Sequence, residues 1–96
     1  MKPRVIFRPA ADRDIDGAFS WYERQQVGLG NQFLTSLNNT VEMIRAGPES
    51  YPVVRHSIRR AVLGRFPYLV FYVVEPDRVV VLACLHASRD PDAWPS

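Results

Sequence analysis

Residues 58–85 read IRRAVLGRFPYLVFYVVEPDRVVVLACL, which is three short runs of apolar and β-branched residues with a turn signal in each gap. Such runs are typical of strands. The second gap, EPDR at residues 75–78, has proline at the second position of a type I turn, and residues 64–67 form another tight connection. The stretch therefore predicts an antiparallel meander with strands over residues 58–63, 68–74 and 79–85.

The turn at residues 75–78 also predicts the strand register. Continued along the strands, it places Tyr72 opposite Val81 and Tyr68 opposite Leu85, and facing residues share one side of the sheet. That side carries both tyrosines and, across the first turn, Arg59. The other side is entirely apolar, so we expect the helices to cover it. Its residues are Leu69, Phe71, Val73, Val80, Leu82 and Cys84.

The sequence before the meander predicts a short strand over residues 5–8 and then two amphipathic helices. Apolar residues recur at helical spacing from residue 11 to a break at 27–30, and again from 31 to 46. Helices segregated from strands indicate an α+β fold in the order β-α-α-β-β-β. We expect one domain over residues 1–96, with an antiparallel helical hairpin packed on one face of a small, mainly antiparallel sheet. The place of the first strand in the sheet stays open.

The glycines at the helix break follow a helix rather than a strand. A phosphate-binding glycine loop follows a strand and opens a helix. Gly28-Leu29-Gly30 is therefore interpreted as a turn and not as a phosphate cradle.

Composition excludes several classes of protein. The chain is 47% hydrophobic and 23% charged, which is ordinary for a globular domain and excludes disorder. No apolar run approaches the roughly 18 residues of a membrane span, and the basic start lacks the apolar region of a signal peptide, so we expect a cytoplasmic protein. One cysteine, Cys84, excludes an internal disulfide and a cysteine-based zinc site. Two isolated histidines give no metal-ligand spacing, so no metal or cofactor is predicted.

The second half of the chain carries a candidate anion site. Between residues 50 and 74 there are four arginines and no acidic residue. The register gathers a basic and aromatic set toward one end and one face of the sheet. Arginine binds phosphate or carboxylate, tyrosine stacks on bases, and a histidine transfers protons. The alternative is structural, with arginines guarding an edge strand and tyrosines covering an open sheet face. The set is Arg59, Arg65, Tyr68, Tyr72, His86 and Arg89.

Two further residues fall off the apolar stripes of the helices. Trp21 lies well away from the stripe of the first helix, and Met43 lies nearly opposite that of the second. Each is either additional core at the boundary or part of a docking patch for a partner.

The whole chain resembles the RelE/ParE superfamily of toxins from bacterial type II toxin–antitoxin modules, which include plasmid-stabilisation modules. The resemblance rests on the order strand–helix–helix–meander and on several degenerate motifs with the expected order and spacing. They are VIFRPAA at 5–11, GLG at 28–30 with Phe33-Leu34 after it, Ile44 through Gly47-Pro48, RRAVLGRFPY at 59–68 and VVVLACLHASRDP at 79–91.

The superfamily divides by target, and the resemblance implies two activities. RelE-like members are ribosome-dependent mRNA endonucleases that use a basic cluster, often with lysines, and an acid or base near the chain's end. ParE-like members bind and poison DNA gyrase. Here the only lysine is Lys2, and the residues after Arg89 contain no His, Tyr, Lys or Arg, which favours a ParE-like, non-enzymatic inhibitor.

The nuclease alternative stays open, because the arginines could hold a phosphate and His86 could act as the base of a metal-independent endoribonuclease. Its acid would have to be Tyr68 or Tyr72. A degenerate copy that only binds antitoxin is a third possibility.

Each of these activities implies the same partner, an antitoxin whose disordered segment folds onto the helical hairpin and the sheet edge. Trp21 and Met43 are the antitoxin contacts we expect, and the basic second half of the chain suits an acidic, amphipathic segment.

Overall fold

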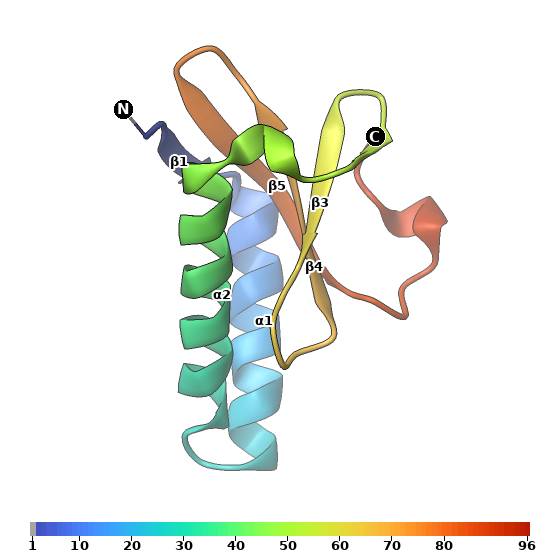
Figure 1. The fold of residues 1–96 in the computed structure, drawn as a ribbon. Coiled ribbons are helices and arrows are strands. Elements are labelled where there is room, and N and C mark those ends of the chain that lie inside the picture. The colour runs from blue at the N-terminus through green and yellow to red at the C-terminus, as the bar shows by residue number, and fades with distance from the viewer. Residues whose placement is uncertain (1) are drawn as a thin grey trace.

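The computed structural model describes residues 2–96 and has two layers, a helical hairpin and a five-stranded sheet (Figure 1). The expected α+β order is confirmed, with one additional short strand. In chain order the elements are β1 (Arg4–Phe7), α1 (Pro9–Gln25), α2 (Leu29–Ala46), the 3₁₀ turn η1 (Pro48–Ser50), β2 (Val53–Arg55), β3 (Ile58–Val62), β4 (Tyr68–Val74), β5 (Arg78–His86) and the 3₁₀ turn η2 (Pro91–Ala93).

A carboxylate closes the helical hairpin. The two oxygens of Glu23, near the end of α1, accept hydrogen bonds from the backbone N–H groups of Gly28 and Gly30, each at 3.0 Å. Gly28 has a left-handed φ of 91°, which glycine adopts without strain. At Gly30 a Cβ would lie 2.8 Å from the ring of Phe19, so the helices approach closely there. The Gly28-Leu29-Gly30 segment is thus a turn. Its N–H groups at Gly28 and Gly30 donate to the Glu23 carboxylate and are not available to an anionic ligand.

The sheet order is β1-β5-β4-β3-β2, with β1 parallel to β5 and the other pairs antiparallel. The first strand therefore lies at one edge, next to the last. Strand β2, which the sequence did not predict, pairs with β3 through Val53 and Arg59. Because β2 is the opposite edge, β3 is an inner strand, and the alternative that its arginines guard a sheet edge is wrong.

The predicted register holds at the β4–β5 turn and fails farther along. Tyr72 pairs with Val81 as expected, but Tyr68 pairs with His86 instead of Leu85. Leu82 is an extra residue on β5, a bulge that shifts every later pair by one.

The prediction of which face lies under the helices is wrong. The cluster beneath the hairpin contains Tyr72 and Val81, whereas Leu69 and Phe71 belong to a second cluster on the opposite face. Of the six residues expected beneath the helices, Cys84 alone packs in the helix-side cluster, because the bulge turns it over. Alternation favoured the wrong face, because the side that carries the tyrosines also holds enough valines to form the core.

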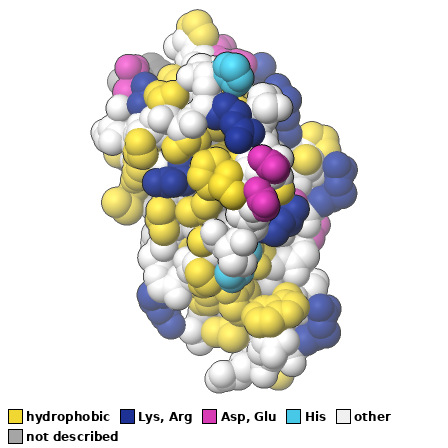
Figure 2. Space-filling view, turned by 90° about the vertical axis from the view of Figure 1, so that its right-hand side faces the viewer, with side chains coloured by type: hydrophobic (Ala, Val, Ile, Leu, Met, Phe, Trp, Pro, Cys, Tyr) yellow, Lys and Arg dark blue, Asp and Glu magenta, His cyan; other side chains and the backbone are white. Residues whose placement is uncertain are grey.

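The C-terminal residues cover the second face. The ring of Trp94 lies 5.1 Å from that of Phe71, and Arg55 donates to the carbonyl oxygens of Pro91 and Trp94 at 3.1 and 3.3 Å. In Figure 1 this segment runs past the side of the sheet away from the helices, and Figure 2 looks onto that side. A short tail therefore covers the face of the sheet that no helix covers.

Candidate functional site

The six residues predicted to form one anion site fall into two groups. Arg65 lies in the β3–β4 turn, and His86 ends β5 at the same end of the sheet, where the N–H of Ala87 donates to the carbonyl of Pro67 at 2.7 Å. Tyr68 pairs with His86, and Arg89 donates its N–H to the His86 carbonyl at 3.0 Å. Arg59 and Tyr72 pair with each other four residues along β4 from Tyr68, a span of about 13 Å.

The second group of two is structural. Tyr72 is fully buried beneath the helices, and its hydroxyl donates to the carbonyl of Pro48 at 2.6 Å. Burial raises the pKa of Tyr72 to about 12, against an opposing effect of Arg59. The guanidinium of Arg59 donates to the carbonyls of Tyr51 at 2.6 Å and Glu49 at 3.2 Å. Both side chains thus fix the segment after α2, and the expectation that they lie on an open face is wrong.

Tyr68 is half-buried on the helix side of the sheet, not on an open face. Its ring lies 5.2 Å from that of Phe33 and 5.2 Å from that of His86, both at steep angles. Burial raises the pKa of the Tyr68 hydroxyl, with smaller effects from Tyr22 and Cys84. A phenol with a raised pKa holds its proton more firmly and is a weaker general acid.

Backbone geometry defines the protonation of His86. Its Nδ1 accepts a hydrogen bond from the backbone N–H of Ser88 at 3.0 Å, and the Ser88 hydroxyl lies 2.8 Å away. An Nδ1 that accepts from an N–H carries no proton, so the neutral ring has its proton on Nε2. In this arrangement the free nitrogen is a hydrogen-bond donor, which suits binding better than proton abstraction.

Two adjoining hollows lie between α1 and this end of the sheet. The first, here named the aromatic hollow, has a volume of about 530 Å³ and is lined by Gly17 together with Ala18, Trp21, Tyr22, Pro67, Tyr68 and His86. The second, the basic hollow, is about 280 Å³. It shares Gly17 and His86 with the first and adds Arg13, Asp14 and Arg89. Trp21, half-exposed, thus lies in the same depression as two of the predicted target-binding residues.

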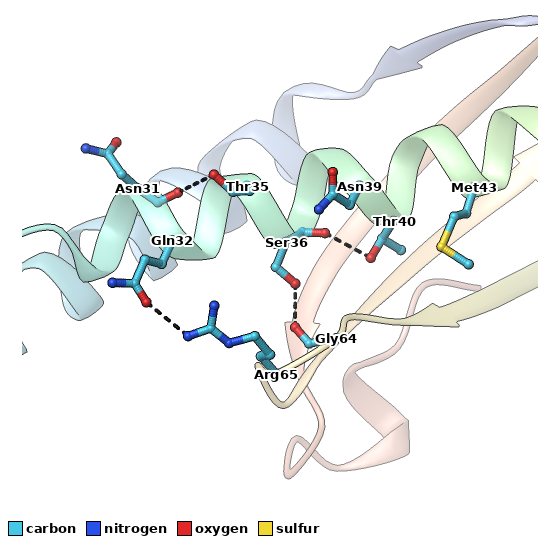
Figure 3. Close-up of a pocket in the computed structure, with 9 residues that line it drawn as sticks. All are labelled: Asn31, Gln32, Thr35, Ser36, Asn39, Thr40, Met43, Gly64 and Arg65. Carbon is cyan, nitrogen blue, oxygen red and sulfur yellow. Dashed lines mark hydrogen bonds between the residues drawn. The ribbon is translucent and has the colours of Figure 1, made fainter.

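Arg65 faces a different depression, here named the polar groove (Figure 3). This groove of about 410 Å³ runs between α2 and the β3–β4 turn, and amide and hydroxyl side chains line most of it. Arg65 has a left-handed φ of 72° and donates to Gln32 on α2 at 3.0 Å, and the Ser36 hydroxyl donates to the carbonyl of Gly64. Met43 lies at the far end of the groove from Gln32.

The two predicted antitoxin contacts are therefore apart. Trp21 lines the aromatic hollow and Met43 lines the polar groove, and these two depressions share no lining residue. They flank the β3–β4 turn, which contributes Gly64 and Arg65 to the groove and Pro67 to the hollow. A partner that touches both must occupy two separate depressions of the surface.

The structure brings together only some of the parts of a metal-free nuclease, since Tyr68, His86 and Arg89 line the basic hollow and the other candidates lie elsewhere. Arg59 is held by carbonyl groups, Tyr72 is buried, and Arg65 lies across the turn from His86. Residues 2–96 contain no group of three His, Cys, Asp or Glu side chains placed to hold a metal ion.

Cys84 is buried, and burial raises the pKa of its thiol to about 12, as suits an inert core cysteine. Within residues 2–96 no helix is long and apolar enough to cross a membrane.

The candidate site residues predicted from the sequence did not include Arg13 or Gly17 of α1. Arg13 and Gly17 precede Trp21 at intervals of four, so all three lie on one face of the helix. Gly17 lies opposite the apolar stripe of α1. A glycine on the same helix face as an exposed tryptophan was the sequence feature that could have indicated a depression there.

Comparison with known proteins adds a family and a fold. A family model described as the ParE toxin of the type II toxin–antitoxin system parDE matches residues 5–91. The fold is similar to a solved structure of the chromosomal ParDE system from P. aeruginosa, with a TM-score of 0.80, 13% identity, and coverage of 91% of this chain and 98% of the other. It is also similar to the conserved hypothetical protein HP0894 from Helicobacter pylori, with a TM-score of 0.62, 15% identity, and coverage of 93% and 98%. No curated protein matches the sequence.

Proposed function

This chain belongs to the ParE toxin family of type II toxin–antitoxin systems, and we propose that it arrests growth by binding and poisoning DNA gyrase until a cognate antitoxin neutralises it. The observation that carries the proposal is the family match over residues 5–91, which spans both helices and all five strands. Gyrase acts on DNA, so the protein would work in the cytoplasm.

The site geometry supports inhibition by binding rather than by cleavage. A nuclease of this kind needs a base, cations around the phosphate and an acid for the leaving oxygen. Arg59 and Tyr72 are committed to the fold, and Nδ1 of His86 accepts a hydrogen bond from the Ser88 N–H, so only Nε2 is free to meet a ligand. What the end of the sheet offers is a set of hydrogen-bond donors, which suits contact with a target surface.

We assign the target contacts to Arg65, His86 and Arg89, which lie at one end of the sheet. Arg65 is exposed on the turn, and Arg89 is exposed just after β5. Cations at this end would also speed association with an acidic target. In this assignment the imidazole of His86 is a hydrogen-bond donor, not an obligatory proton carrier.

The test is a pair of assays on purified protein, namely gyrase supercoiling and ribosome-dependent mRNA cleavage. We expect inhibition of supercoiling and no cleavage, and growth arrest on expression without antitoxin. Verified soluble expression with normal growth would instead identify a degenerate copy that only binds antitoxin.

Substitutions then separate binding from proton transfer. Because glutamine keeps a side-chain N–H donor, His86→Gln should retain most of the growth arrest, whereas Arg65→Ala and Arg89→Ala should weaken it. Loss of a general base costs about 10²–10⁴-fold in rate. Complete detoxification by His86→Gln, together with mRNA cleavage by the wild type, would put the nuclease in place of the gyrase inhibitor.

A further inference from the structure

A notch in α1 opens the aromatic hollow. Gly17 lines both hollows, and a Cβ built there meets no heavy atom within 4 Å. Glycine weakens a helix interior, yet it stands here between Arg13 and Trp21 on one helix face. A larger side chain at this position would project into the depression, so the absence of a side chain keeps the hollow open.

The walls of the hollow fit one bulky apolar group. The ring of Trp21 meets that of Tyr22 at 85° with centroids 5.1 Å apart, and Tyr68 meets His86 at 76° and 5.2 Å. Neither pair is stacked, so ring edges as well as ring faces line the hollow. An inserted leucine or phenylalanine side chain can contact several of these walls at once.

The adjoining basic hollow sets the charge of the occupant. Arg13 and Arg89 line it, and its one acidic side chain, Asp14, accepts the backbone N–H of Cys84 at 3.0 Å. Asp14 thus serves the sheet, and the two guanidinium groups leave the rim positive. Binding of an apolar side chain in the aromatic hollow is therefore favoured when the residues next to it in the partner segment carry carboxylates, which can pair with Arg13 and Arg89.

We infer that the aromatic hollow receives one large apolar side chain of the antitoxin, from a segment whose flanking residues are acidic, and that this docking covers His86 and Arg89. The inference rests on the proposed function and deepens it. Because Trp21 and His86 line the aromatic hollow and Arg89 lines the adjoining basic hollow, neutralisation follows from direct occlusion of the target contacts and needs no change of shape in the toxin.

Filling the notch tests the inference without removing any contact. The antitoxin encoded in the same operon is purified and titrated against wild type, Gly17→Leu and the control Ser20→Leu by calorimetry. Ser20 is exposed on the same helix and lines neither hollow. We expect Gly17→Leu to weaken binding by at least about 30-fold, the scale of one lost interface anchor, and Ser20→Leu to change it by less than about 3-fold.

Folding is checked in the same samples by thermal melting. Leucine is a better helix former than glycine, so the melting temperature of Gly17→Leu should equal or exceed that of the wild type. Gly17→Gln, with a polar side chain that also fills the notch, is a second variant in case the leucine perturbs folding. Wild-type affinity in a folded Gly17→Leu or Gly17→Gln variant would overturn the inference while leaving the proposed function intact.

Salt dependence tests the acidic flanks. Arg13→Gln should weaken antitoxin binding several-fold at low salt and make little difference at 1 M NaCl, where charges are screened beyond about 3 Å. An effect of the same size at both salt concentrations would argue against carboxylate partners at this rim.

A nucleotide arm tests the other class of occupant. In Trp94→Phe, Trp21 is the one remaining tryptophan, and its fluorescence reports on the hollow directly. We expect no quenching by millimolar AMP. Saturable quenching that Gly17→Leu abolishes would mean that the hollow binds a nucleotide and not a side chain of the antitoxin.

If the wild type binds no antitoxin at all, both the inference and the antitoxin part of the proposed function fail, whereas gyrase inhibition is judged separately.

Discussion

The two faces of the sheet are closed by different means. The face toward the hairpin packs under two long helices, and its cluster holds fully buried rings such as Phe33 and Tyr72. The cluster on the opposite face contains five buried residues, and this face is closed by the tail through Trp94 and the two hydrogen bonds from Arg55.

The difference shows how a chain of 96 residues covers a sheet that is apolar on both sides. A second pair of helices would need many more residues, whereas a tail with one aromatic anchor needs only a few. Because the free energy of local opening depends on the contacts that are broken, a tail held by few contacts detaches from the sheet more easily than the helices do. We therefore expect the helix side to dominate stability and the tail side to relax more readily.

The largest effect should come from removing one ring on each face. Phe33 and Phe71 are both fully buried, so each alanine substitution leaves a cavity. Phe33→Ala should lower the free energy of unfolding by about 4–5 kcal/mol, since the packed helices cannot collapse into the space. Phe71→Ala should lower it by about 3 kcal/mol, because the tail can move inward. Urea unfolding measures both, and the reverse order would contradict the comparison.

The next effect separates the two tryptophans. Trp94 packs on Phe71, so Trp94→Ala should cost about 1–3 kcal/mol of stability. Trp21 is 50% exposed, and Trp21→Ala should change the free energy of unfolding by less than about 0.5 kcal/mol. Thermal melting of the pair provides the matched control. Equal losses would mean that Trp21 is core and not part of a docking surface.

The smallest effect concerns the buried hydroxyl on the helix side. Tyr72→Phe removes the donor to the Pro48 carbonyl and should cost about 1 kcal/mol near neutral pH. The fold was expected to leave this tyrosine on an open face, where the same change would cost almost nothing. An unchanged free energy of unfolding would show that the Pro48 carbonyl has another partner in solution.

The pH dependence follows from the same burial. Because the pKa of Tyr72 is raised to about 12, its contribution to stability is complete below the unfolded pKa of about 10 and is lost as pH rises toward 12. The Cys84 thiol, also raised to about 12, loses its contribution from about pH 9 upward. Urea unfolding at pH 7 and pH 11 should show that Tyr72→Phe and Cys84→Ala each reduce the alkaline loss.

Local residue choices made much of the fold predictable. The helix break at Gly28, the end of α2 at Gly47-Pro48 and the β4–β5 turn each depend on residues a few positions apart. The register near the turn was right for the same reason, and it failed where Leu82 bulges. A bulge depends on how two strands fit over their whole length, and no local signal marks it here.

The candidate site was predictable only in part. Arg65, His86 and Arg89 lie at one end of the sheet, as the register implied, because β3 and β5 end there and β4 begins there. Arg59 was assigned to this site, but its guanidinium turned out to hold backbone carbonyls, which no spacing reveals. Arg13 was missed because α1 comes from the other half of the chain, and packing alone places it beside Arg89.

The sequence by itself determined the element order apart from β2, the helical hairpin and the turns, because periodicity, prolines and glycines act over a few residues. Only the tertiary structure decided which face of the sheet lies beneath the helices. Alternation favoured the side without Tyr68, Tyr72 and Arg59, but the other side also carries enough apolar residues to pack beneath the helices. The outcome depended on contacts between distant segments, among them the hydroxyl of Tyr72 on Pro48 and the ring of Trp94 on Phe71. Contacts of that kind exist only once the chain has folded.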